Sequence, residues 1–150
     1  FIERVETLAV SEFKEEMKFK MLSPMVVSTQ IDSDNGLQTY YYRPFDKKIS
    51  EAVRKSLIKK YETIYQKTPR NTELMFEVDK EYVEKKGGEE KVSKLITLSE
   101  GKKDETRVKG FLTPFTMKGS TELMRTGWEC GIGDKCSLGF GCVDVVKRKN

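Results

Sequence analysis

The segment ECGIGDKCSLGFGCV, residues 129–143, has the glycine content of a loop whose backbone approaches a phosphate group. Its glycines follow the pattern Gly-x-Gly, five residues, Gly-x-Gly: Gly131, Gly133, Gly139 and Gly141. A dinucleotide fingerprint needs a third glycine three places after the second, and a nucleotide-triphosphate loop needs Gly-Lys-Ser/Thr. The third place holds Cys136, and the lysine of the loop, Lys135, follows an aspartate. The pattern therefore argues against a mononucleotide or dinucleotide site.

The elements around this loop also differ from those of a nucleotide-binding unit. Residues 121–130 have helical periodicity, with Leu123, Met124 and Trp128 facing inward, and residues 140–147 alternate as a strand. The order helix, loop, strand is the reverse of a Rossmann or P-loop unit. We therefore expect no helix N-terminus to point at a ligand here.

The composition indicates one domain with a highly charged surface. The chain has 150 residues, of which 35% are charged, and a formal net charge of +4; charged residues make up about 25% of an average domain. Net charge governs association and solubility rather than fold, so it does not identify a polyanionic partner by itself. No stretch approaches the roughly 18 apolar residues of a membrane helix, and no signal-peptide pattern is present. We expect a cytoplasmic protein without a membrane partner.

The cysteines and the absence of histidine limit the available chemistry. Cys130, Cys136 and Cys142 are odd in number and have no histidine to accompany them. Neither a disulfide framework nor a zinc site of the usual spacing fits them, so we expect reduced thiols, no metal and no cofactor. Proton transfer near neutral pH also lacks the side chain that most often performs it.

Hydrophobic periodicity predicts a mixed fold of helices and strands. The expected elements are a strand from residue 17 through residue 29, a helix over 47–66, a strand over 73–79, a charged link over 80–91, a hairpin of 92–100 and 106–117, a helix over 121–130 and a last strand over 140–147. This order predicts an α+β, ferredoxin-like (βαββαβ) fold, an antiparallel sheet with two helices on one face. Residues 1–16 are expected to be a lead-in or linker remnant, and residues 17–150 to form the domain.

Three further groups of side chains each allow two interpretations. The expected helix over 47–66 has an excess of basic residues on its solvent side: Lys47, Lys48, Arg54, Lys55, Lys59 and Lys60. They form either a solvated face or a binding surface for a polyanion. The tyrosines at 40–42 are either packing residues or stacking platforms for bases. Arg125 has Glu122 and Glu129 at helical spacings, which favours an ion pair over a ligand contact.

Three stretches of the sequence resemble one family. MLSPMVV at 21–27, VKGFLTPFTMKGSTELM at 108–124 and CGIGDKCSLGFGCV at 130–143 are similar to the C-terminal half of the CRISPR-associated endoribonucleases that process precursor CRISPR RNA, members of the RAMP superfamily. The glycine spacing before the last strand is the most specific of the three. The resemblance covers residues 17–146 and implies a RAMP- and RRM-like ferredoxin fold, as the second of two such halves in tandem.

The resemblance implies that the glycine-rich loop, residues 131–141, and nearby basic residues bind RNA. The expected RNA-binding residues are Gly131, Gly133, Lys135, Gly139, Gly141, Lys109 and Lys118. Structural alternatives exist for them, because the glycines also suit a tight helix-to-strand connection without a ligand. Lys135 likewise suits a solvated loop, and Lys109 and Lys118 are expected to extend the same basic strip.

In that family the general acid and base, commonly including a histidine, sit in the first half. This chain has no histidine, so we expect its catalytic residues to lie upstream, the chain to be a fragment of a metal-independent endoribonuclease, and the chain alone to be inactive. Expected partners are CRISPR repeat RNA and an N-terminal ferredoxin-like half, with effector subunits or a second copy as further candidates. The alternatives are a non-catalytic RAMP subunit of a CRISPR effector complex and a small-ligand module.

Overall fold

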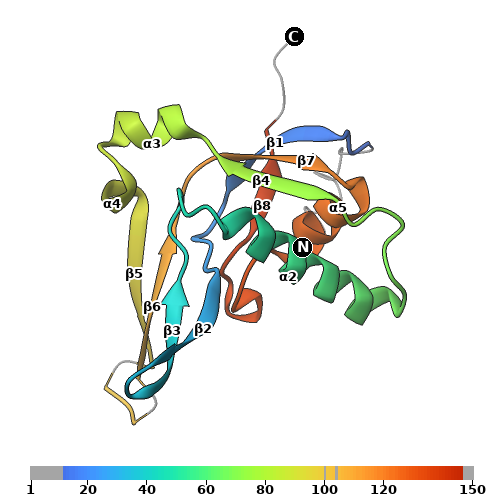
Figure 1. The fold of residues 1–150 in the computed structure, drawn as a ribbon. Helices are drawn as coiled ribbons and strands as arrows, with labels where there is room; N and C mark the ends of the chain where they lie inside the picture. The colour runs from blue at the N-terminus through green and yellow to red at the C-terminus, as the bar shows by residue number, and fades with distance from the viewer. Residues whose placement is uncertain (1–11, 100, 104, 147–150) are drawn as a thin grey trace.

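A computed structural model describes residues 12–99, 101–103 and 105–146. Its centre is a four-stranded antiparallel sheet with the strand order β4-β7-β1-β8. The strands are β1 (Glu16–Met21), β4 (Leu74–Val78), β7 (Phe115–Gly119) and β8 (Val143–Val145). Helices α2 (Ile49–Tyr65) and α5 (Thr121–Cys130) pack on one face of this sheet (Figure 1). The predicted ferredoxin-like arrangement is confirmed.

The core forms because alternate side chains of each strand face the two helices. On β1, Phe19 is fully buried while Lys18 and Lys20 are exposed on the opposite face. The ring of Phe115 of β7 stacks on that of Phe19, with centroids 5.3 Å apart. The ring of Phe76 of β4 also packs against Phe115, with centroids 4.9 Å apart. Phe115 is therefore the aromatic residue that joins three strands of the sheet.

The two helices bury apolar stripes at steps of three or four residues. In α2 the buried side chains are those of Ile49, Val53, Leu57 and Tyr61. Helix α5 begins after Ser120, whose hydroxyl accepts a hydrogen bond from the Leu123 N–H at 3.2 Å, as a helix cap does. Trp128 is buried, as predicted, and its Nε1 donates to Asp144 at 3.2 Å.

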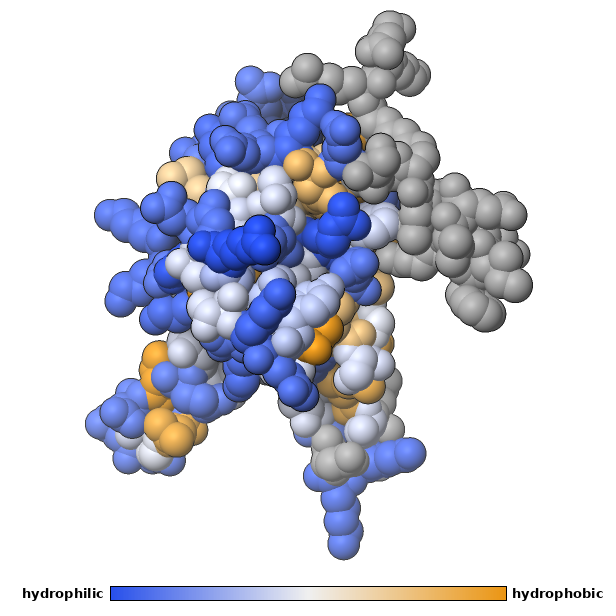
Figure 2. All heavy atoms as spheres, turned by 90° about the vertical axis from the view of Figure 1, so that its right-hand side faces the viewer, coloured by the Kyte–Doolittle hydropathy of each residue, from blue (hydrophilic) through white to orange (hydrophobic). Residues whose placement is uncertain are grey.

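Two excursions from the ferredoxin-like core make hairpins. Along the chain, one hairpin follows β1 and precedes α2; it consists of β2 (Ser28–Ser33) and β3 (Gly36–Tyr41). The other follows β4 and precedes β7 in the chain; it consists of β5 (Ser93–Leu98) and β6 (Thr106–Phe111). The Tyr41 hydroxyl donates to the Arg107 carbonyl at 3.3 Å, which joins the two hairpins. Their ends diverge as two projections below the body; the body is mostly hydrophilic on this face, whereas both projections also carry hydrophobic residues (Figure 2).

Three expected strands are shorter than predicted. The last, expected over 140–147, is only β8 (Val143–Val145), because residues 139–141 form a turn. The other two are interrupted near a proline. The strand expected over 17–29 ends at Met21, and Met25 instead bridges to Phe111. The strand expected over 106–117 is divided into β6 and β7 by residues 112–114, which include Pro114. Proline has no N–H to donate to a sheet, so neither strand continues through it.

The expected charged link over 80–91 is helical, as α3 (Lys80–Lys86) and α4 (Glu89–Val92). The Asp79 carboxylate accepts a hydrogen bond from the Tyr82 N–H at 3.1 Å and so caps α3. This bond is the main reason why the pKa of Asp79 lies below its usual value. The aspartate cap was a recognisable signal in the sequence.

Of the expected lead-in, residues 1–16, residues 1–11 lie outside the described part. Phe13 packs edge-on against Trp128 with centroids 5.8 Å apart, and the Arg125 guanidinium lies 4.7 Å from the centre of the Phe13 ring. Glu122, which the sequence paired with Arg125, instead accepts a hydrogen bond from the Tyr61 hydroxyl at 3.0 Å. Among the described residues, no helix has the length and apolar character needed to cross a membrane.

We predict that Phe115→Ala lowers the free energy of unfolding by about 3–5 kcal/mol, because it opens a cavity where three strands meet. Chemical denaturation measures this loss. Phe45→Ala is the control, since Phe45 is 40% exposed, and its loss is expected to stay below about 1 kcal/mol. Equal losses in the two variants would contradict the central place given to Phe115.

Candidate RNA-binding site

The glycine-rich loop connects α5 to β8 and is folded onto the protein's own backbone. The Ile132 N–H donates to the Gly141 carbonyl at 2.9 Å and thereby closes the loop. The Gly141 N–H donates to the Pro24 carbonyl at 2.8 Å, and the Asp134 N–H donates to the Val26 carbonyl at 2.6 Å. The loop is thus seated on the segment that follows β1.

Two of the glycines are required by close contacts with the backbone. A Cβ atom at Gly133 would lie 2.3 Å from the Val26 carbonyl oxygen, and one at Gly141 would lie 2.1 Å from the Ile132 carbonyl oxygen. Both also have positive φ values, 92° and 73°. Any other side chain would displace the backbone here, so these two glycines serve the folding of the loop.

Lys60 of α2 enters this loop from the side. Its ammonium group donates to the carbonyl oxygens of Gly131 and Gly133, each at 2.9 Å, and contacts the Cys136 sulfur at 3.1 Å. An ammonium group has three N–H donors, and these contacts use all of them. Lys60 therefore fixes the curvature of the loop. This role was not predicted, because the sequence pattern placed Lys60 on the solvent side of the helix.

A basic groove runs between α2, the loop and the base of the β2–β3 hairpin. It consists of two neighbouring hollows of about 620 and 420 Å³, which share Ser56, Lys59 and Asp134 in their walls. Lysines line it along the helix: Lys48, Lys55, Lys59 and Lys60. The first three are exposed, so their ammonium groups can reach a ligand. We call this feature the α2 groove.

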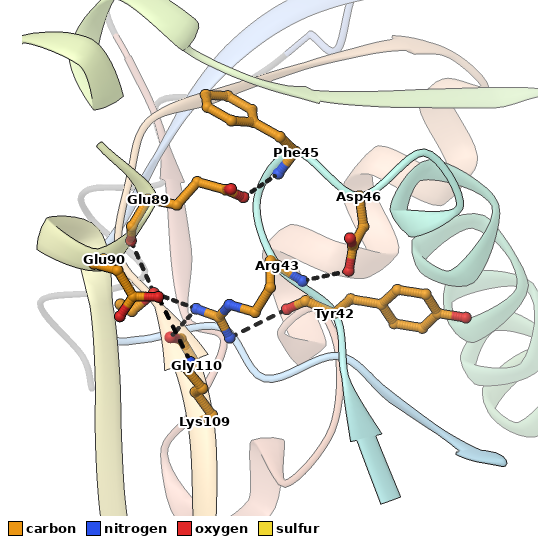
Figure 3. A network of polar contacts seen from close by, with 9 residues as sticks. Tyr42, Arg43, Phe45, Asp46, Glu89, Glu90, Lys109 and Gly110 are labelled. Atoms are coloured by element: carbon orange, nitrogen blue, oxygen red, sulfur yellow. Dashed lines mark hydrogen bonds and ion pairs between the residues drawn. The ribbon is translucent and has the colours of Figure 1, made fainter. Parts of the chain in front are cut away.

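Tyr42 lines the same groove, and a polar network around Arg43 holds it in place (Figure 3). The Arg43 guanidinium donates to the Gly110 carbonyl at 3.1 Å, to the Tyr42 carbonyl at 3.3 Å and to the Ser93 hydroxyl. Its backbone N–H donates to the Asp46 carboxylate at 2.7 Å. The network connects residues 40–42, the tyrosine segment, to the β5–β6 hairpin.

Nearby carboxylates partly offset the effect of burial on the charged guanidinium of Arg43. Burial lowers the pKa of the Arg43 guanidinium, and the nearby carboxylates of Glu89, Glu90 and Asp46 oppose that effect. Asp46 also accepts a hydrogen bond from the Tyr40 hydroxyl at 2.5 Å, and this bond raises the pKa of Tyr40. Arg43 thus acts as a structural cation between the two hairpins.

The structure separates the lysines that the sequence placed on one basic strip. Lys135 is exposed at the tip of the glycine-rich loop. Lys109 lies on β6, 3.9 Å from Glu90, while Lys118 is exposed on β7, on the face of the sheet opposite the helices. Because residues 112–114 interrupt the expected strand, Lys109 and Lys118 belong to different sheets.

The arrangement suits the binding of phosphate groups by charge rather than proton transfer. Exposed lysines line an open groove, and the loop beside it is held rigidly by backbone hydrogen bonds. The chain has no histidine. Within the described ranges, no three His, Cys, Asp or Glu side chains gather as a metal ion would require.

A ferredoxin-like sheet with a glycine-rich loop before its last strand defines a domain of the RAMP class. The family model for "CRISPR associated protein Cas6, C-terminal" matches residues 7–145, and the chain belongs to this family. The resemblance inferred from the three sequence stretches is confirmed.

Individual relatives agree with this assignment. The chain is 30% identical over 143 residues to the "Putative CRISPR-associated endoribonuclease-like protein Cas6nc" of Pyrococcus horikoshii, covering 95% of this chain and 54% of that protein. It is 30% identical over 131 residues to the "CRISPR-associated endoribonuclease Cas6 1" of Methanocaldococcus jannaschii, covering 87% of this chain and 46% of that protein. The chain thus spans about half the length of these curated relatives.

Solved structures show the same fold. A structure described as "An RAMP protein binding different RNA substrates" superposes with a TM-score of 0.72 at 30% identity, over 92% of this chain and 51% of that one. A Cas6-related protein from Pyrococcus furiosus gives a TM-score of 0.73 at 26% identity, over 93% of this chain and 51% of that one.

We predict that Gly141→Ala lowers the free energy of unfolding by about 3 kcal/mol or more, because its methyl group would overlap the Ile132 carbonyl. Gly139→Ala is the matched control, since nothing lies within 4 Å of a Cβ atom there. Its positive φ alone is expected to cost about 1–2 kcal/mol. Chemical denaturation of both variants compares them, and an equal loss would argue against the close backbone contact.

Proposed function

We propose that this chain is the RNA-binding C-terminal half of an endoribonuclease that cleaves CRISPR repeat RNA. The α2 groove carries this proposal, because it places exposed lysines beside the glycine-rich loop, within the residues that the family model matches. The names of the relatives support it, since two of them are described as CRISPR-associated endoribonucleases or endoribonuclease-like proteins. The domain expected over residues 17–150 extends on its N-terminal side at least to Phe13, which packs against Trp128.

The lysines of the groove bind the RNA backbone. Lys55 and Lys59 lie one turn apart on one side of α2, and Lys48 lies at the N-cap of this helix and lines the same groove. A row of cations of this kind follows a phosphodiester chain and releases condensed counterions when it binds. Lys135 extends this contact from the loop, and Lys109 and Lys118 meet other parts of the RNA. The binding free energy is therefore strongly dependent on salt.

Cleavage needs proton transfer, for which this chain lacks the side chain that most often performs it, histidine. A metal-independent mechanism makes the ribose 2′-hydroxyl the nucleophile, which requires a general base, a general acid for the leaving oxygen and a cation for the phosphate. The chain supplies lysines for the last of these roles but has no histidine for the first two. The N-terminal ferredoxin-like half supplies the acid and the base and is the main protein partner; CRISPR effector subunits or a second copy are further partners.

We predict that the double variant Lys55→Gln, Lys59→Gln binds CRISPR repeat RNA about tenfold more weakly than the wild type at moderate salt. The salt slope of the binding constant should fall by about 0.7 to 0.9 for each phosphate contact that is lost. Filter binding or fluorescence anisotropy in EDTA measures both quantities. The RNA should remain uncleaved throughout.

The matched control is Lys85→Gln, Lys91→Gln, which removes the same charge from exposed positions of α3 and α4. It should leave the affinity within about twofold. If both double variants weaken binding equally, net charge and not the α2 groove determines affinity. Cleavage of the repeat RNA by this chain alone would overturn the division of roles.

A further inference from the structure

Asp134 places a carboxylate in the middle of the basic α2 groove. It lies in the walls of both hollows, beside Lys55 of α2 and the shared Lys59. A carboxylate at this position repels the phosphates that the lysines attract. Binding of the RNA backbone alone does not call for a carboxylate at this position.

The surroundings of Asp134 hold its carboxylate in a fixed position without neutralising it. Its N–H donates to the Val26 carbonyl at 2.6 Å, and its Oδ2 accepts a hydrogen bond from the Ser28 hydroxyl. In the described part of the chain, no lysine or arginine forms an ion pair with Asp134. The other acidic residue of the groove, Glu51, is paired with Arg54 at 2.9 Å. Of the two carboxylates that line the groove, that of Asp134 is thus the one without a cation partner among the described residues.

The remaining lone pairs of this carboxylate match one nucleobase best. A carboxylate is an acceptor with two oxygens and about four lone-pair sites. Guanine is the RNA base whose Watson–Crick edge presents two adjacent donors, N1–H and N2–H. Adenine and cytosine each place a ring-nitrogen acceptor beside their amino group, and uracil places its one N–H between two carbonyls. Only guanine therefore donates two parallel hydrogen bonds to a carboxylate.

The groove also has room and an aromatic wall for a base. Its larger hollow, about 620 Å³, falls within the range of about 300–1,000 Å³ for small-molecule sites. Tyr42 lies in the same wall and is anchored by its N–H to the Val27 carbonyl at 2.8 Å. Its ring meets Tyr40 edge-on, with centroids 5.3 Å apart. An aromatic side chain beside a polar acceptor is a usual arrangement for recognising an unpaired base.

We propose that the α2 groove selects an unpaired guanine, which donates from its Watson–Crick edge to Asp134 while Tyr42 stacks on its face and Lys55 and Lys59 hold the flanking phosphates. Ser28 is a positioning residue, because it acts through the Asp134 carboxylate. This proposal rests on the proposed RNA-binding function and adds to it the base that the site recognises.

The test measures binding of the full 150-residue chain to single-stranded oligouridylate ten-mers that carry one central guanosine, inosine, 7-deazaguanosine or adenosine. Inosine lacks the N2 amino group, whereas 7-deazaguanosine keeps the whole Watson–Crick edge. We expect the guanosine and 7-deazaguanosine oligomers to bind equally, and the inosine and adenosine oligomers to bind about 5- to 100-fold more weakly.

Asp134→Asn keeps the acceptor for Ser28 but replaces one oxygen by an amide donor, which faces the donors of guanine. We expect this variant to lose the preference for guanosine over inosine. Glu129→Gln is the control, because it removes the same charge from an exposed residue next to the loop and should keep the preference. A ratio of two affinities is compared, so a uniform loss of folded protein does not change it.

Binding of all four oligomers with equal affinity by the wild type would overturn the guanine proposal and leave the RNA-binding function standing. A preference that survives in Asp134→Asn would also overturn it, because another residue would then read the base. The absence of any binding, to these oligomers and to repeat RNA, would overturn both the guanine proposal and the function on which it rests.

Discussion

The geometry of the candidate site depends on one ammonium group, that of Lys60, inside a loop of backbone carbonyls. Its bonds to Gly131 and Gly133 set the path of the chain as it leaves α5. That path brings the Asp134 N–H to the Val26 carbonyl and the Gly141 N–H to the Pro24 carbonyl. The loop is in this way attached both to a helix and to the segment after β1. These attachments hold the loop at one side of the α2 groove and leave the groove open to solvent.

This arrangement assigns different tasks to backbone and side chains. The glycines allow the loop to fold against its own protein, since Gly133 and Gly141 contact backbone atoms of the chain itself. Contact with a nucleic acid falls to the side chains that line the groove, from α2, the loop and the tyrosine segment. The Arg43 network fixes the position of residues 40–42 relative to α2 and the loop, because it joins Tyr42 to the β5–β6 hairpin.

Much of the fold could be predicted from the sequence because local periodicity determines it. The stripe of α2 and the alternation of β1 and β4 specify the sheet and the helix that covers it. The break at Pro114 was missed because an apolar run appeared continuous across it. The role of Lys60 and the separation of Lys109 from Lys118 depend on contacts between residues far apart in the chain, for which no local pattern exists. Lys60 did carry one signal, since it directly precedes Tyr61 at the edge of the buried stripe.

The most direct test of the account is amide hydrogen exchange in the RNA-free protein, comparing the wild type with Lys60→Met. The amides of Ile132, Asp134 and Gly141 are expected to exchange slowly in the wild type, because all three donate to backbone carbonyls. In Lys60→Met they should exchange faster while the amides of β1 change little. Fast exchange of these loop amides in the wild type, or no response to the substitution, would contradict a loop that Lys60 holds in shape before RNA binds.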